Sequence, residues 1–181
     1  MSLIRATALA AALLACAGAT KAAQQCGATT HSTFGETRAY FQNSLGACRP
    51  DGYCSVVLAL TPPNDPHDYA QTLRIARPTP GAPHEVSLVS VVPSATEDGQ
   101  PMSVSFGRRP IDLVGMTEFR DNTVNEFHVT DRAAIDAIVS GARRSNGMRW
   151  SYQSEAGPAD AWFALGGVTR ALNWIDCMGR R

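Results

Sequence analysis

Four cysteines constrain the fold of this 181-residue chain more than any other feature. They are Cys26, Cys48, Cys54 and Cys177, and a fifth, Cys16, falls in an apolar N-terminal stretch. An even number of cysteines in a compartment that permits disulfides predicts a domain held together by covalent cross-links. Four cysteines allow three connectivities.

The spacing of the cysteines favours one of these connectivities. Cys48 and Cys54 are six residues apart, and the Pro-Asp-Gly at 50–52 is typical of a turn that folds two sulfurs back together. That pair leaves Cys26 with Cys177, a bond that closes nearly the whole domain and stabilises it by about 4 to 5 kcal/mol. A zinc site is the alternative, but no Cys-x-x-Cys and no histidine at finger spacing supports it, so we expect neither a metal nor a cofactor.

The first 22 residues are typical of a signal peptide. Arg5 supplies a positive charge, residues 6–17 form a short apolar stretch, and small residues follow. The stretch is too short for a stable membrane span, which takes about 20 apolar residues. Removal of residues 1–22 leaves a single domain, 23–181, with a net charge of −2 and no lysine.

A second interpretation of the same segment concerns Cys16. Residues 13–16, Leu-Leu-Ala-Cys, resemble the lipobox of bacterial lipoproteins, in which cleavage precedes the cysteine and its sulfur is acylated. The alternative is that Cys16 is only a small apolar residue of the signal. Both interpretations predict an exported protein, either free in the periplasm or anchored to the envelope by lipid at Cys16.

Composition and charge exclude several classes of protein. With 44% hydrophobic residues, the chain is long enough for one core and too short for two, which excludes disorder and a multidomain enzyme. The 16 basic and 16 acidic residues form no long run of either sign. We therefore expect no nucleic acid among its partners.

The pattern of apolar residues predicts an α+β fold, a mostly antiparallel, sandwich-like β-sheet with two short helices. At 102–106 apolar residues alternate with serines, as in a strand with one wet face. The residues before 55 are interpreted as a polar lead-in. Further strands are expected at 55–60, 69–77, 86–92, 111–114, 123–129, 148–152 and 161–165.

The two predicted helices follow these strands, and one of them is C-terminal. Thr130 is expected to cap the first, with Asp131 in its opening turn. The second begins after Gly166 and Gly167. Their apolar stripes are Ala134, Ile135, Ile138 and Val139, and Val168, Ala171, Leu172 and Ile175. Core or half-buried positions are expected for Trp150, Trp162 and Trp174.

No catalytic constellation stands out among the reactive residues. There is no Gly-x-Ser-x-Gly elbow, and no two histidines have the spacing of metal ligands. His67 beside Asp65 and Asp68, and Glu126 two residues from His128 on one strand face, come nearest to a site. A solvated loop and an edge ion pair are the simpler explanations, so we predict no catalytic residue.

The candidate binding residues lie in predicted loops. Three lie between Cys48 and Cys54, two in the proline-rich stretch 61–68, and two in a turn whose arginines can bind carboxylates or phosphates through two hydrogen bonds. They are Arg49, Asp51, Tyr53, Asp65, His67, Arg108 and Arg109.

Two segments resemble a known family. Residues 47–55, Ala-Cys-Arg-Pro-Asp-Gly-Tyr-Cys-Ser, and residues 162–176, which contain Ala-Leu-Gly-Gly-Val-Thr-Arg-Ala-Leu, resemble the exported bacterial proteins that share domain of unknown function 1176. More distantly, the chain is similar to the invasion-associated locus B proteins of bacterial envelopes. The resemblance implies export and a small sheet-rich domain, and it implies no catalytic residue. After Asp176 the chain departs from the family pattern, with Cys-Met-Gly in place of a polar, glutamine-containing stretch.

The sequence thus favours a non-catalytic periplasmic or envelope-associated domain that binds a protein or another envelope component. One alternative is an inhibitor of a secreted hydrolase such as lysozyme, in which loop 61–68 or 49–53 would plug the active site. Another is an unrecognised periplasmic hydrolase that depends on His67 and His128.

Overall fold

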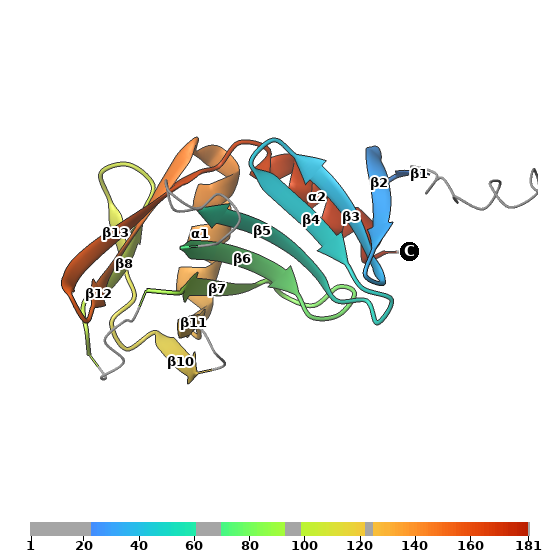
Figure 1. Ribbon diagram of the computed structural model, residues 1–181. Helices are drawn as coiled ribbons and strands as arrows, with labels where there is room; N and C mark the ends of the chain where they lie inside the picture. Colours follow the sequence, from blue (N-terminus) through green and yellow to red (C-terminus); the bar gives the residue numbers. More distant parts are fainter. Residues whose placement is uncertain (1–22, 61–69, 93–98, 122–124, 181) are drawn as a thin grey trace, which may run out of the picture.

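The strands form two antiparallel sheets in the computed structural model, which describes residues 23–60, 70–92, 99–121 and 125–180. The large sheet has nine strands in the order β1-β2-β3-β4-β5-β6-β7-β11-β10, and the small sheet has four in the order β13-β12-β8-β9. Figure 1 shows the small sheet at one end of the molecule and β1 to β4 at the other.

The strands of the large sheet are β1 (Ala23–Gln25), β2 (Ala28–Thr33), β3 (Glu36–Phe41), β4 (Ser44–Cys48), β5 (Cys54–Leu60), β6 (Gln71–Arg77), β7 (Glu85–Ser90), β10 (Thr117–Asp121) and β11 (Asn125–Val129). Those of the small sheet are β8 (Met102–Ser105), β9 (Pro110–Asp112), β12 (Gly147–Ser154) and β13 (Gly157–Ala164). The helices are α1 (Arg132–Arg144) and α2 (Val168–Met178). Among the described residues, no helix has the length and apolarity needed to cross a bilayer.

An aromatic cluster joins the two sheets in the core. Trp150 of β12 is fully buried and stacks on Tyr152 of the same strand, with 4.2 Å between ring centroids. Phe127 of β11 meets Trp150 edge-on at 6.1 Å. The Tyr152 hydroxyl accepts a hydrogen bond from Gln71 of β6 and shares another with Ser90 of β7. One end of the large sheet is therefore held against the inner face of the small sheet.

Helix α2 packs on β3, β4 and β5 because two glycines leave room for it. Gly46 of β4 lies under Trp174, and a Cβ there would lie 2.7 Å from the indole. Gly167, which precedes α2, has φ +85°, and a Cβ there would collide with the Phe41 carbonyl. The Trp174 indole also donates a hydrogen bond to the Gln25 carbonyl at 3.1 Å. The glycine pair at 166–167 is therefore a strand-to-helix turn, as its sequence context favours.

Two disulfides link the same cysteines that the spacing favoured. Cys26, in the turn between β1 and β2, is bonded to Cys177 of α2, 151 residues away. Cys48 and Cys54 close the turn between β4 and β5. The first bond fixes the edge strand β1 to the C-terminal helix, whereas the second closes only a local loop.

The predicted α+β class and both helices are confirmed, but three local predictions are wrong. Asp131, not Thr130, caps α1, because its carboxylate accepts a hydrogen bond from the Ala134 amide at 2.8 Å. Ser105 is only 5% exposed, so the face of β8 that carries the serines is not open to solvent along its whole length. Trp162 is 64% exposed, because it lies on the outward face of β13.

The interpretation of residues before 55 as a polar lead-in is also wrong. They form β1 to β4, connected by two-residue turns at 26–27, 34–35 and 42–43. Polar side chains fit there because much of this part of the sheet is open to solvent.

The two disulfides should differ in their effect on stability. The double variant Cys26→Ser/Cys177→Ser should lower the free energy of unfolding by about 5 kcal/mol, because it frees a long loop in the unfolded chain. The matched variant Cys48→Ser/Cys54→Ser should lower it by about 2 kcal/mol. Urea titration of both would measure the difference, and equal losses would contradict this account.

Candidate functional site

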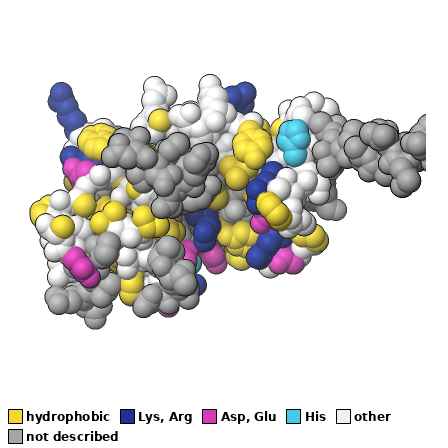
Figure 2. All heavy atoms as spheres, in the orientation of Figure 1, with side chains coloured by type: hydrophobic (Ala, Val, Ile, Leu, Met, Phe, Trp, Pro, Cys, Tyr) yellow, Lys and Arg dark blue, Asp and Glu magenta, His cyan; other side chains and the backbone are white. Residues whose placement is uncertain are grey.

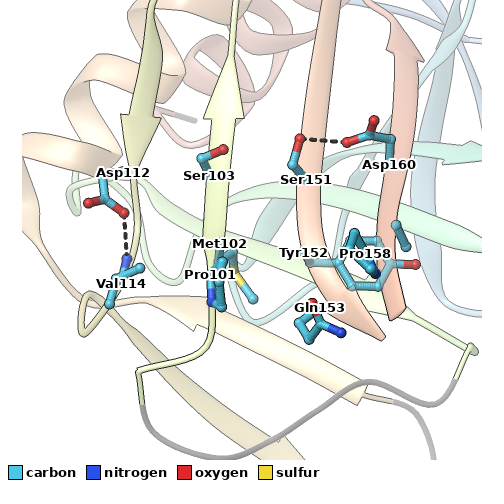
Figure 3. A pocket seen from close by; sticks show the side chains of 11 residues that line it. Pro101, Met102, Ser103, Asp112, Val114, Ser151, Tyr152, Gln153, Pro158 and Asp160 are labelled. Atoms are coloured by element: carbon cyan, nitrogen blue, oxygen red, sulfur yellow. Dashed lines mark hydrogen bonds between the residues drawn. The ribbon is translucent and has the colours of Figure 1, made fainter. Parts of the chain in front are cut away.

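A row of four polar side chains crosses the outer face of the small sheet, one from each strand. Strand register places Asp160 opposite Ser151, Ser151 opposite Ser103, and Ser103 opposite Asp112. They face outward because the alternate residues on β8 and β12, such as Trp150, are buried in the core. We call these four residues the polar row, and Figure 3 shows them in a line across the strands.

The polar row lies in a hollow of about 430 Å³, a volume within the range of small-ligand sites. Gln153, Pro158 and Pro101 also line this hollow, and the buried Met102 and Tyr152 contribute to it from the strands that carry the row. Its lining combines apolar surface with a few hydrogen-bonding groups, as in sites that orient a ligand.

Internal hydrogen bonds orient both carboxylates of the row. Ser151 donates to one oxygen of Asp160 at 2.5 Å, and the Val114 amide donates to one oxygen of Asp112 at 3.0 Å. Among the residues that the structure describes, the Ser103 hydroxyl has no partner. The remaining acceptor positions are therefore available to a ligand that brings hydroxyl or N–H donors.

The pair of side chains next to the polar row, Arg149 and Trp162, combines a cation with an aromatic ring. Arg149 lies opposite Trp162, two residues along from Ser151 and Asp160, and its guanidinium lies 5.4 Å from the indole centroid. The Arg149 Nε is buried, and within the described ranges it has no hydrogen-bond partner. The indole of Trp162 is exposed beside the hollow, so this face offers a ligand a flat apolar surface next to the carboxylates.

Cross-strand pairing brings Ser87 to the Glu126 and His128 pair that the sequence singled out. The Ser87 hydroxyl lies 3.2 Å from Nδ1 of His128, and Nε2 of His128 lies 3.2 Å from Glu126. These are the residue types of a catalytic triad, but Ser87 is only 4% exposed, and Arg74 also binds the Glu126 carboxylate at 3.1 Å. The geometry fits an ion-pair ladder across β6, β7 and β11 better than an accessible nucleophile.

A second ionic cluster fixes α2 to its neighbours. The Asp176 carboxylate accepts hydrogen bonds from Arg77 of β6 at 2.6 Å and from Arg143 of α1 at 3.1 Å. His84 lies beside it, with Nε2 at 3.6 Å from Asp176, beyond hydrogen-bond distance. Burial, and then the positive charge of Arg77, lower the pKa of His84, and Asp176 offsets this only in part.

The structure brings together three of the predicted binding residues, in the loop closed by the second disulfide. Arg49 pairs with Asp51 at 3.1 Å, and its guanidinium lies 4.3 Å from the Tyr53 ring centroid. Asp51 accepts a hydrogen bond from the Tyr53 amide, and burial raises the pKa of the Tyr53 hydroxyl. The side chains of the loop are thus paired with one another.

The other predicted residues do not join that loop. Arg108 and Arg109 are exposed in the turn between β8 and β9 of the small sheet. Cys16, Asp65 and His67 lie outside the described residues. Within the described ranges, no three His, Cys, Asp or Glu side chains come together as metal ligands. On the face drawn in Figure 2, basic and acidic side chains are interspersed.

The fold and the hollow define a class: a disulfide-bonded antiparallel α+β sandwich with a polar site on one outer face. No protein-family model matches the chain, and no curated protein matches it, so the resemblance to family 1176 remains a prediction. Among solved structures, the crystal structure of invasion associated protein b from Bartonella henselae is similar, with a TM-score of 0.59 over 80% of this chain and 99% of that one. At 12% sequence identity, this likeness shows a common fold and nothing more. It supports the resemblance to the invasion-associated locus B proteins at the level of the fold.

Acidification should destabilise the protein through His84. Because its pKa in the folded state is below the ordinary 6.5, the unfolded chain binds a proton that the folded protein does not. The free energy of unfolding should therefore fall as the pH drops below about 6.5 and level off below the folded-state pKa. The urea midpoint at about pH 7.5 and about pH 5.5 measures this loss.

The variant His84→Gln should show a smaller loss over the same range. The control His31→Gln changes an exposed side chain of β2 and should behave like the unchanged protein. An unaltered pH dependence of stability in His84→Gln would show that His84 does not cause the loss of stability at low pH.

Proposed function

We propose that this protein is an exported, non-catalytic binding domain of the bacterial envelope, and that it binds an envelope component through the polar row. Residues 1–22 act as the export signal and residues 23–181 form the binding domain. The observation that carries the proposal is the hollow on the small sheet, where two oriented carboxylates lie beside the exposed Trp162.

Export is supported by the N-terminal sequence and by the covalent structure. Disulfides persist in oxidising compartments such as the periplasm, and the described part of this chain holds two. Whether the mature protein is free or anchored through Cys16 depends on which signal peptidase cleaves it.

Binding rather than catalysis is supported by the chemistry of the hollow. Its lining, as far as the described ranges show it, includes serine hydroxyls, carboxylates and one amide, but no histidine, cysteine or lysine. Ser151 donates to Asp160 without an imidazole to take its proton, so nothing in this lining activates the hydroxyl as a nucleophile. Such groups hold and orient a ligand by hydrogen bonds.

Mass spectrometry and sedimentation test this function. Protein expressed with its own N-terminal segment should be found outside the cytoplasm, either starting near residue 23 or acylated at Cys16. Purified, unacylated protein comprising residues 23–181 should sediment with washed envelope fragments, whereas the same protein with Asp112→Asn/Asp160→Asn/Trp162→Ala should stay in solution. A cytoplasmic full-length product, or sedimentation unaffected by the triple variant, would contradict the proposal.

A second candidate function rests on the loop closed by Cys48 and Cys54. The Arg49 amide donates to the Tyr53 carbonyl at 2.8 Å, and the Gly52 amide donates to the Arg49 carbonyl at 3.1 Å. A loop held in one conformation loses little entropy on entering an enzyme's active site, as in many hydrolase inhibitors.

If the protein inhibits lysozyme, a micromolar excess should slow the clearing of a bacterial suspension. The variant Arg49→Ala/Tyr53→Ala should lose this effect, while Arg108→Ala/Arg109→Ala should keep it. Unchanged clearing in the presence of the unmodified protein removes this enzyme as a target.

A further inference from the structure

We infer that the ligand of the polar row is a neutral, extended oligosaccharide that lies across the four strands of the small sheet. This inference rests on the proposed function and names the chemical class of its ligand. Four steps lead to it: the length of the row, its hydrogen-bonding groups, the ring beside it and its charge.

The length of the row fits a short chain of sugar rings. Neighbouring strands are about 4.8 Å apart, so the four side chains span about 14 Å across the sheet. One strand spacing is close to the length of one pyranose ring in an extended β-linked chain. Asp112 and Asp160, at the two ends, are therefore placed to contact different rings of about a trisaccharide.

The hydrogen-bonding groups of the row match those of sugar hydroxyls. Each hydroxyl of a sugar both donates and accepts, and carboxylate oxygens are the strongest acceptors that a protein offers to O–H donors. Asp160 and Asp112 each keep one oxygen that is not held by the internal hydrogen bonds. The Ser103 hydroxyl can donate to a ring or glycosidic oxygen, and the Gln153 amide carbonyl can accept from a hydroxyl.

Trp162 supplies the apolar part of the site. A pyranose ring presents C–H groups on its faces and hydroxyls around its edge, so it needs a flat apolar surface beside polar acceptors. The indole of Trp162 is on the same outward face as Asp160, two residues along β13, and the Arg149 guanidinium lies over one face of its ring, which leaves the other face for a sugar. A ring stacked on the indole therefore places its edge toward Asp160.

The charges of this face favour a neutral ligand. Of the residues that the structure describes, two carboxylates and no basic side chain line the hollow, so a phosphate or a carboxylate would be repelled. A polyamine stretched between Asp112 and Asp160 would follow Ser151 and Ser103, with the like charge of Arg149 on the same face two residues along β12 from Ser151. Neutral hydroxyl groups satisfy the carboxylates without adding a like charge beside that guanidinium.

Tryptophan fluorescence and calorimetry test the inference with tri-N-acetylchitotriose as the probe. Trp150 and Trp174 are 0% and 2% exposed, so a change in emission on binding reports on Trp162. The oxidised full-length chain should show a saturable blue shift with the trisaccharide, because stacking removes water from the indole. Spermidine, the cationic comparison, should produce neither a blue shift nor heat of binding.

Variants locate the site. Asp112→Asn, Asp160→Asn and Trp162→Ala should each weaken binding by about tenfold or more in calorimetry. The controls Glu118→Gln and Tyr40→Ala change an exposed carboxylate and an exposed ring on the large sheet, and both should bind like the unmodified protein. Near-native unfolding midpoints for all five variants would show that each remains folded.

Three outcomes overturn the inference: no binding of the trisaccharide up to its solubility limit, tight binding of spermidine, or binding that the three site variants leave unchanged. The sedimentation experiment separates this failure from failure of the proposed function. If the unmodified protein sediments with envelope fragments and the triple variant does not, while the trisaccharide neither binds nor competes, the site binds the envelope but its ligand is not this kind of sugar.

Discussion

The packing of Trp150 against Phe127, reinforced by the hydrogen bonds of the Tyr152 hydroxyl with Gln71 and Ser90, sets the position of the small sheet against the large one. It places the even-numbered residues of β12 in the core, and strand alternation then turns Arg149, Ser151 and Gln153 outward. The polar row is thus a consequence of how the core is packed. A change that moved the Trp150 ring would shift the strand that carries the middle of the row.

A second constraint acts at the other end of the molecule, where α2 lies against β4. Gly46 leaves room for Trp174, the disulfide from Cys26 holds the helix to the edge strand, and Asp176 joins it to Arg77. The carboxylate of Asp176 is partly buried, and guanidinium groups of two elements compensate for the hydration that it loses.

Strong periodic patterns predicted most of the fold, and weak ones did not. Both helices and most strands after residue 54 carry apolar stripes or alternation that is visible whatever the details of packing. The strand β10, Thr117–Asp121, was not predicted. The first four strands carry no such pattern, although their turns at 26–27, 34–35 and 42–43 recur every eight residues, as in a meander. The turn at 34–35 was missed because its first residue is not a typical turn residue. Phe34 has φ +52°, a conformation more typical of asparagine or glycine in such turns.

The candidate site could not be read from the sequence, because its four residues come from four strands and are neighbours only through register. The position of the small sheet in the molecule also has a consequence for how the polar row is presented. β1 and the C-terminal helix are bonded at one end of the elongated molecule, and the small sheet lies at the opposite end. A chain tethered to a membrane through the residues before Ala23 would therefore hold the polar row away from that membrane.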